Sequence, residues 1–323
     1  MVLMIKRISK MNKPYISVVI PVYNESENLE QLYQRVIAAL DKLDKPHEII
    51  LVNDGSEDDS YNQLNELQKR RPEQIRIIHF NGNFGQHMAL MAGFERVRGE
   101  IIITLDADLQ NPPEEIYRLV NLIEKGHDYV GGIRKNRQDT FFRRYASIIN
   151  NWLRYKMTKI RLSDQGCMLR AYRRSLIDLM IASKETSLFI PAQAYRLSIS
   201  PAEIEVAHDA RKSGESKYNL YRLLRLNFDW MTSFTLLPLQ IFTMLGLFIS
   251  MLSSFFVVYL FLRRIIIGPE VEGVFTLFAI VFFLMGIMLM GLGIMGEYIG
   301  RIYQEVRHRP RYVIRKIIDD TNE

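Results

Sequence analysis

Cysteine is almost absent from this chain of 323 residues, in which Cys167 is the single example. One cysteine excludes an intrachain disulfide and a zinc site built from several cysteines. The sequence also lacks a glycine-rich G-x-G-x-x-G motif after its first apolar run and has no G-x-x-x-x-G-K-S/T motif. The main sequence evidence for a dinucleotide-dependent dehydrogenase or a P-loop nucleoside triphosphatase is therefore missing. The first 13 residues have no long apolar core and are not a secretory signal peptide, so we expect the first domain to stay where it is made.

Between residue 15 and about residue 210, short apolar runs alternate with stretches of helical spacing. Strands that are apolar along their whole length, with helices between them, are typical of a parallel sheet covered on both faces. The sequence therefore predicts an α/β domain with a mostly parallel sheet. The expected strands are 16–21, 48–53, 75–80 and 100–105, and the expected helices are 25–43, 60–71 and 86–98.

Charged residues are missing from two long C-terminal stretches, 231–262 and 273–296. Each stretch exceeds the roughly 20 apolar residues that a helix needs to cross a bilayer. The alternative is a buried helix of a soluble protein. Two such stretches, separated by a short charged loop, instead favour a helical hairpin that spans the membrane twice.

Positive charge is distributed unevenly about this hairpin, because the loop between the two stretches contains only Arg263 and Arg264. Both ends of a hairpin lie on one side, so an excess of arginine and lysine in the flanks places these ends and the large domain in the cytoplasm. Such flanks also bind anionic head groups, which accounts for much of the formal net charge of +6 without a nucleic acid partner. The flanking cations are Arg222, Arg225, Arg301, Arg307, Arg309, Arg311, Arg315 and Lys316.

These patterns divide the chain into four parts. We expect a cytoplasmic α/β domain over 1–217, followed by an amphipathic helix beside the membrane over 218–232. Two transmembrane helices then occupy 233–296, and 297–323 forms a basic cytoplasmic tail.

The sharpest local signal is the pair Asp106 and Asp108, which follows the apolar run 100–105. In an extended segment, residues i and i+2 point the same way, so the two carboxylates can converge on one site. Like charges this close repel unless a cation or a proton lies between them. Carboxylate oxygens suit Mg²⁺ or Mn²⁺, which also bind phosphate oxygens. Taken alone, however, the spacing is better explained by an ordinary acidic turn.

Two further polar turns change that weighing, because Pro21–Glu25 and Asn53–Ser56 also follow apolar strands. Ligands of open parallel sheets bind at the carboxyl ends of the strands. The three turns together therefore predict one pocket that is suited to a nucleotide.

These three turns, Pro21–Glu25, Asn53–Ser56 and Asp106–Gln110, resemble the motifs of the GT-A glycosyltransferases of family 2. Further stretches resemble one branch of that family, the bacterial polyprenyl-phosphate glycosyltransferases, and the likeness covers nearly the whole chain. The resemblance implies a GT-A nucleotide-sugar-binding domain followed by a two-helix transmembrane hairpin. The further stretches are Gly85–Phe94, Gln110–Glu115, Gln165–Arg173, Gly214–Tyr218 and Gly296–Tyr303.

The resemblance also assigns residues to a UDP-sugar donor and a divalent metal. Asp106 and Asp108 match the two carboxylates of the metal motif, and Gln110 matches a further metal ligand. Asp164 stands where the family often has its candidate base, although a phosphate acceptor needs no strong base. The residues assigned to UDP are Pro21, Tyr23 and Glu25 for the uridine, Asp54 for the uracil or ribose edge, and Arg211 and Lys217 for the diphosphate.

A phosphate acceptor requires cationic partners, and arginine suits bidentate phosphate contacts. Arg134 and Arg137 come after an apolar strand that we expect at Tyr129 and Val130. In relatives, an arginine followed four residues later by a serine contacts the lipid phosphate, which implies this role for Arg143 and Ser147. A solvated surface charge is the alternative for each arginine.

The resemblance implies a bacterial inner-membrane enzyme, a tetramer by analogy, that transfers a sugar from UDP to undecaprenyl phosphate with inversion, assisted by Mg²⁺ or Mn²⁺. Likeness favours 4-deoxy-4-formamido-L-arabinose as the sugar, for the modification of lipid A, with glucose or an N-acetylhexosamine as the alternative.

A processive polysaccharide synthase is less favoured because the chain has no Gln-x-x-Arg-Trp motif. The intact Asp106 and Asp108 pair argues against a non-catalytic membrane scaffold.

Overall fold

The computed structural model of the chain describes residues 13–134, 163–164, 166–183, 189–207, 237–268, 274–306 and 310–319. The chain divides into two compact units. The first unit comprises Met1–Tyr145, Ile160–Glu215 and Pro310–Glu323, and the second comprises Ala146–Lys159 and Ser216–Arg309.

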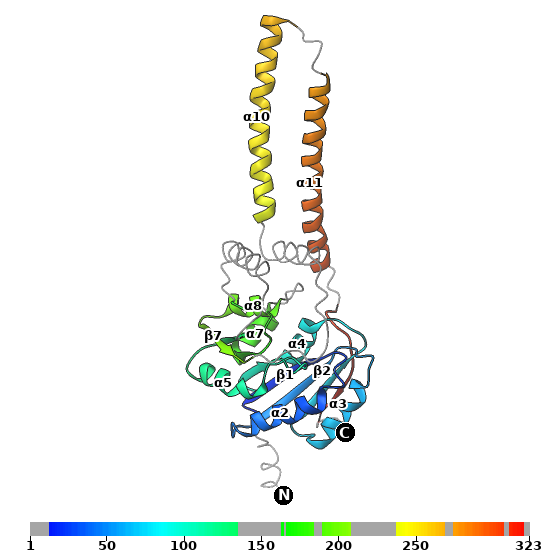
Figure 1. Ribbon diagram of the computed structural model, residues 1–323, viewed down its shortest axis with the longest axis vertical. Helices are drawn as coiled ribbons and strands as arrows, with labels where there is room; N and C mark the ends of the chain where they lie inside the picture. The colour runs from blue at the N-terminus through cyan, green and yellow to red at the C-terminus, as the bar shows by residue number, and fades with distance from the viewer. Residues whose placement is uncertain are drawn as a thin grey trace. The chain divides into compact units, whose positions relative to one another are not determined.

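The described part of the first unit contains an eight-stranded sheet in the order β7-β5-β6-β4-β1-β2-β3-β8 (Figure 1). All strands run in one direction except β6 and β8, which are antiparallel to their neighbours. The expected mostly parallel sheet is therefore confirmed. The strands are β1 (Ile16–Val22), β2 (His47–Asn53), β3 (Ile75–Phe80), β4 (Ile101–Thr104), β5 (Tyr129–Arg134), β6 (Arg170–Arg173), β7 (Pro201–Val206) and β8 (Ile314–Ile318).

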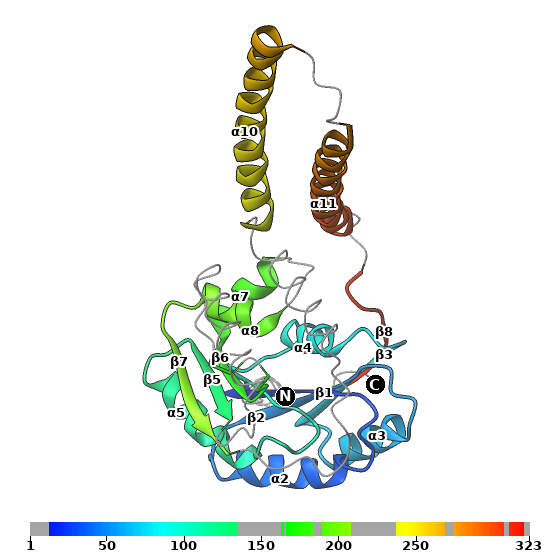
Figure 2. The ribbon, with the colours of Figure 1, turned by 45° about the horizontal axis from the view of Figure 1, so that its top comes forward.

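Helices cover both faces of this sheet (Figures 1 and 2). Successive side chains of β1 point to opposite faces of the sheet, and both faces are apolar. Val18 and Ile20 pack in the core under one layer of helices, and Val19 faces the second layer. Gly93 allows this second contact, since a Cβ there would come within 2.3 Å of Val19. One layer contains α2 (Leu29–Asp41), α3 (Ser60–Arg70) and α5 (Ile116–Glu124), which follows a short 3₁₀ turn, η1 (Pro113–Glu115); the other contains α4 (Gln86–Phe94), α7 (Arg174–Ala182) and α8 (Ile190–Leu197).

Two helices are shorter than their apolar spacing predicts, because side chains capture the backbone around them. The expected helix 25–43 begins only at Leu29, since the amides of Glu25 and Ser26 donate to Ser60 and Asp58. The expected helix 86–98 ends at Phe94. Beyond it, the amides of Arg98 and Gly99 donate to side chains of the sheet, Glu48 and Ser17.

Two parts of the expected basic tail 297–323 form regular structure. Helix α11 (Val274–Val306) extends into it, and Ile314–Ile318 forms β8, which pairs with β3 at the edge of the sheet. Ile317 and Ile318 are partly buried there, while the charges between them and Ile314 stay exposed. The basic residues of this short strand concealed its apolar pattern in the sequence.

The described part of the second unit consists of two long helices, α10 (Leu237–Ile267) and α11 (Val274–Val306). Gly291 of α11 lies against the ring of Phe242 of α10, where a Cβ would come within 2.1 Å of the ring. Within the described residues, the segment Ile280–Gly300 has the length and mean hydropathy (2.1) of a membrane span, and α10 contains a shorter apolar stretch, Leu239–Ile249. The hairpin that spans the membrane twice therefore stays a prediction.

The buried side chain of His79, in β3, is hydrogen-bonded on both ring nitrogens. Asn53 donates to its Nδ1 (3.1 Å) and its Nε2 contacts the Oδ1 of Asn65 (3.0 Å), an arrangement that requires a neutral ring. Burial, helped by the charges of Lys316 and Arg315, lowers the pKa of His79 to about 4.

Between pH 6.5 and pH 4, the unfolded chain therefore binds a proton at His79 that the folded chain does not bind. We expect the free energy of unfolding to fall by roughly 2–4 kcal/mol through this window on account of His79, and to be independent of this residue above pH 7. Thermal unfolding of the wild type and of His79→Gln at several pH values tests this. An equally steep acid dependence in His79→Gln would contradict it.

Candidate functional site

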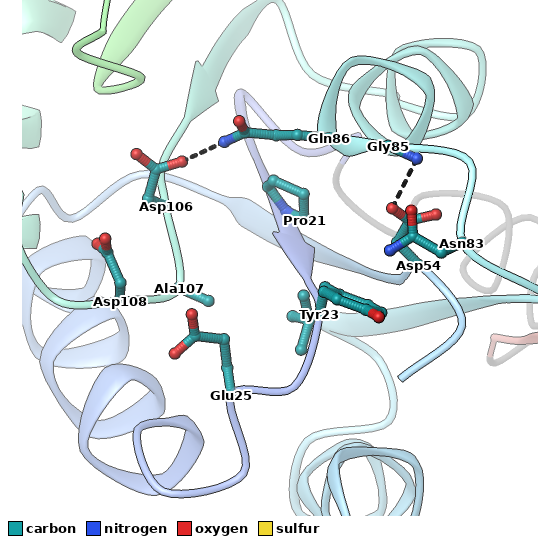
Figure 3. Close-up of a pocket in the computed structure, with 11 residues that line it drawn as sticks. Pro21, Tyr23, Glu25, Asp54, Asn83, Gly85, Gln86, Asp106, Ala107 and Asp108 are labelled. Carbon is teal, nitrogen blue, oxygen red and sulfur yellow. Dashed lines mark hydrogen bonds between the residues drawn. The ribbon is translucent and has the colours of Figure 1, made fainter. Parts of the chain in front are cut away.

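A pocket of about 310 Å³ opens at the carboxyl ends of β1, β2 and β4 (Figure 3). The three polar turns identified in the sequence meet there, as the parallel register of these strands requires. Sequence-distant segments thus contribute to one concave site. The residues that line it are Pro21, Val22, Tyr23, Glu25, Asp54, Asn83, Gly85, Gln86, Asp106, Ala107 and Asp108.

The turns after β1 and β2 are joined to each other by Asn24. Its backbone amide donates to the Oγ of Ser56 (3.1 Å), and its side-chain oxygen accepts a hydrogen bond from the backbone amide of Glu57 (2.8 Å). Asn24 has a φ of 54°, a left-handed conformation that asparagine tolerates better than most residues. The two strand ends therefore form one connected wall of the pocket.

Asp54 fixes the loop that follows β3, residues 81–85. Its carboxylate accepts hydrogen bonds from the backbone amides of Phe84 (2.7 Å) and Gly85 (2.8 Å). Figure 3 shows the bond from Gly85. Burial raises the pKa of Asp54, although the two amide donors act in the opposite direction. Asp54 thus holds part of the pocket backbone in place as well as lining the pocket.

Gly55 allows the same loop to approach closely. Its φ is +69°, and a Cβ there would come within 2.3 Å of the carbonyl carbon of Gly82 and 2.7 Å of the amide nitrogen of Asn83. Any side chain would therefore push the 81–85 loop away from the turn after β2. The glycine is required by both the backbone conformation and the space.

Asp106 and Asp108 lie together at the end of β4, and each is hydrogen-bonded to a glutamine amide. Gln86, the first residue of α4, donates to Asp106 (2.5 Å). Gln110 donates to Asp108 through its side chain (2.5 Å) and its backbone amide (3.1 Å). Leu109 between them has a φ of 61°, which costs an L-residue roughly 1–2 kcal/mol. This strained turn folds Gln110 back onto Asp108.

The electrostatics of the two carboxylates fit a divalent cation. Burial and then the charge of Asp108 raise the pKa of Asp106 to about 7, against the opposing effects of Gln86, Arg134 and Arg170. A cation would relieve this repulsion. Within the described residues, no group of three or more His, Cys, Asp or Glu side chains gathers around one point. Two carboxylates match the way proteins bind Mg²⁺, which keeps waters and phosphate oxygens as its other ligands.

Arg134 and Asp164 form an ion pair near this edge. Arg134, which is the last residue of β5 and does not follow the strand as expected, donates through Nε and Nη2 to the two oxygens of Asp164 (2.7 and 2.9 Å). Burial alone would raise the pKa of Asp164, but the hydrogen bonds and charge of Arg134 hold it below its usual value. An ion-paired carboxylate of this kind is a weak proton acceptor.

The structure therefore brings together most of the residues singled out in the sequence for the nucleotide and the metal. Gln110 contacts Asp108 without lining the pocket itself. The other expected residues lie outside the part of the chain that is described, and they are Arg137, Arg143, Ser147, Arg211 and Lys217.

Three residues of the site escaped the sequence analysis. Asn83 and Gln86 follow β3, whose carboxyl end meets the same edge of the sheet, so the topology alone could have indicated them. Arg170 is fully buried in β6 and donates to the backbone oxygen of Asp164 (2.7 Å) and to the hydroxyl of Tyr129. Arg170 could have been noticed in the sequence as an arginine within an otherwise apolar stretch.

The close approach at Gly55 predicts a sharp difference between two alanine substitutions. Gly55→Ala should displace the 81–85 loop, lower the free energy of unfolding by roughly 1–3 kcal/mol and speed hydrogen exchange at the amides of Phe84 and Gly85. Gly82→Ala is the matched control, because a Cβ at Gly82 has nothing within 4 Å. Equal behaviour of the two variants in thermal unfolding and hydrogen exchange would contradict this account.

Comparison with known proteins agrees with this site. The family described as Glycosyl transferase family 2 matches residues 17–180. The chain is 48% identical over 306 residues to an undecaprenyl-phosphate 4-deoxy-4-formamido-L-arabinose transferase of Edwardsiella ictaluri (strain 93-146), with 94% of each chain covered. It is 47% identical over 307 residues to the transferase of the same name from Serratia proteamaculans (strain 568), again with 94% of each covered.

Among solved structures, glucosyl-3-phosphoglycerate synthase from Mycobacterium tuberculosis, in complex with Mn²⁺, UDP and phosphoglyceric acid, is similar at a TM-score of 0.48 and 16% identity. The similarity covers 68% of this chain and 77% of that chain. The family match and the relatives that share nearly half of their residues over almost the whole chain lead to one conclusion: the chain belongs to glycosyl transferase family 2 and is a glycosyltransferase with a GT-A-like α/β fold.

Proposed function

We propose that this glycosyltransferase moves a sugar from a UDP-sugar to undecaprenyl phosphate, and that the sugar is 4-deoxy-4-formamido-L-arabinose. The observation that carries the reaction class is the pocket in which the Asp106 and Asp108 pair lies beside an exposed aromatic ring and a backbone loop. Such a site offers separate places for a metal-bound diphosphate and for a flat base. The acceptor and the sugar are proposed from the two relatives, which carry both in their names.

The uridine belongs at the β1 side of the pocket. Tyr23 is 43% exposed, so its ring is open to contact with a base. Pro21 and Glu25 flank it on the same strand end and turn (Figure 3). Asp54 lies near Tyr23, with its backbone amide bonded to the oxygen of Val22 (2.9 Å) (Figure 3). Its carboxylate oxygens, which hold the 81–85 loop, retain further acceptor positions for a uracil or ribose donor.

Asp106 and Asp108 would hold Mg²⁺ or Mn²⁺, with Gln110 as a further ligand. Gln110 already contacts Asp108, so rotation of its amide would present the oxygen to the same ion. When bound, the cation stabilises the negative charge that develops on the leaving diphosphate. Arg211 and Lys217 are proposed to add positive charge to that diphosphate.

The reaction itself is a single displacement. An oxygen of the lipid phosphate forms a bond to the anomeric carbon, the bond from that carbon to the diphosphate breaks, and UDP leaves with the electron pair. The acceptor oxygen is already anionic near neutral pH, so no proton has to be removed. This agrees with Asp164, whose carboxylate orients Arg134. Attack opposite to the leaving group inverts the anomeric centre.

The acceptor phosphate is proposed to meet cations at the β5 end of the sheet. Two of the five N–H donors of Arg134 bind Asp164, and the others are able to face a phosphate. Arg137, Arg143 and Ser147 are proposed to complete the acceptor site.

The membrane arrangement completes the proposal. The stretch 233–296 spans the bacterial inner membrane twice, 218–232 lies along its surface, and the catalytic domain is cytoplasmic. The apolar segment Ile280–Gly300 supports one of the two spans. Such an anchor keeps the site at the height of the lipid head groups, which replaces a search in solution by local positioning. We further propose a homo-oligomer and a role in modifying lipid A or another envelope glycan.

The sugar has a defined alternative. Specificity depends on a few hydrogen bonds in the pocket, and glucose or an N-acetylhexosamine would follow the same displacement. The name of the relatives favours formamido-arabinose over both.

The metal assignment is tested by Asp108→Asn in the full-length protein. We expect transfer to fall by roughly a hundredfold or more, and Mg²⁺ or Mn²⁺ no longer to strengthen UDP binding, because the substitution removes a charge that the cation needs. Asp178→Asn is the control, since it removes an exposed carboxylate that pairs with Arg174 on α7. Calorimetry with UDP and an assay of the lipid product measure both effects. Near-normal transfer by a folded Asp108→Asn protein would refute the metal assignment.

A further inference from the structure

The 81–85 loop connects the end of β3 to the start of α4 and carries two residues of the pocket, Asn83 and Gly85. Asp54 holds its amides from inside the pocket, as described above. A different part of the chain, the segment 310–319, contacts the start of the loop through Val313, contains β8 and belongs to the same compact unit.

Tyr312 is the residue of this segment that contacts both the strand before the loop and the residues that directly follow the helix after it. Its ring stacks on Phe80, the last residue of β3, with centroids 4.9 Å apart and planes inclined by 11°. Its hydroxyl donates to a carboxylate oxygen of Glu95 (2.5 Å) and accepts from Arg96 (3.5 Å), two residues that directly follow α4. Burial raises the pKa of Tyr312 to about 12, so the hydroxyl keeps its proton at neutral pH.

The contact continues from Tyr312 into the pocket. Phe80 packs edge-on against Phe84 (5.7 Å between centroids), whose amide binds Asp54. The backbone oxygen of Val313 accepts the amide of Asn81, the first residue of the loop (3.1 Å). At the other end, α4 begins with Gln86, which donates to Asp106. The strand before the loop and the helix after it are therefore both tied to one side chain.

We infer that Tyr312 is a positioning residue for UDP binding, which acts by holding the 81–85 loop against Asp54 through Phe80 and Phe84. The ring of Tyr312 makes the contact with Phe80, and its hydroxyl bonds to Glu95 and Arg96, which directly follow α4. The UDP part of this inference rests on the proposed function. The segment that follows the second long helix is thus a structural part of the nucleotide pocket.

The test compares four variants of the full-length protein. Tyr312→Ala removes the ring and the hydroxyl, and Tyr312→Leu keeps apolar bulk without the ring in case the alanine variant does not fold. Tyr312→Phe keeps the ring. Ile318→Ala is the matched control, because Ile318 packs on the core at the opposite end of β8, next to Ile77, and stabilises the same strand away from the loop.

Two readouts are needed, namely hydrogen exchange at the amides of Phe84 and Gly85 and the dissociation constant of UDP with Mn²⁺. We expect Tyr312→Ala and Tyr312→Leu to speed exchange at both amides and to weaken UDP binding roughly three- to tenfold, the range that the loss of one aromatic pair produces. Tyr312→Phe should restore both values to within about twofold of the wild type. Ile318→Ala should lower the melting temperature without changing either value.

Three results would overturn the inference: unchanged exchange and binding in Tyr312→Ala and Tyr312→Leu, equal effects in Ile318→Ala, or failure of Tyr312→Phe to restore them. If the wild type binds no UDP, the proposed function fails, and the exchange measurement alone decides whether Tyr312 positions the loop. The two failures are therefore distinguishable.

Discussion

The repulsion between Asp106 and Asp108 is the interaction around which the site is built. Burial and then the charge of Asp108 raise the pKa of Asp106 to about 7, which is unfavourable for a protein without a compensating charge. The surrounding structure tolerates the pair through the amides of Gln86 and Gln110 and the strained turn at Leu109. Strain of this kind persists where the fold holds it in place, and it is concentrated at functional sites.

The rest of the pocket is a set of backbone segments that are held by carboxylates and aromatic rings. Asp54 binds two amides of the 81–85 loop, and Tyr312 stacks on Phe80, the residue before that loop. Asp164 likewise fixes Arg134, with the buried Arg170 bound to its backbone oxygen. The acidic residues of the site therefore have two different tasks, since Asp106 and Asp108 are suited to a cation while Asp54 and Asp164 orient other groups.

The sequence predicted the parts of the fold that depend on local pattern. Continuous apolar runs identified β1 to β4, and the polar turns after β1, β2 and β4 identified most of the pocket, because parallel strands bring their carboxyl ends to one edge. It could not predict features that depend on distant partners. The early end of α4 depends on Glu48 and Ser17, and β8 depends on the open edge of β3, to which its charged residues gave no clue. The pairing of Arg134 with Asp164 also joins residues that are 30 positions apart.

The central claim is that this pocket transfers a sugar from a UDP-sugar to a lipid phosphate. It is tested most directly by mass spectrometry of the lipid that the purified full-length protein forms from undecaprenyl phosphate and a panel of UDP-sugars with Mg²⁺ or Mn²⁺. The account predicts a product whose mass equals undecaprenyl phosphate plus one sugar, formed fastest from UDP-4-deoxy-4-formamido-L-arabinose. Consumption of UDP-sugars without any glycosylated lipid, or no consumption of any of them, would contradict it.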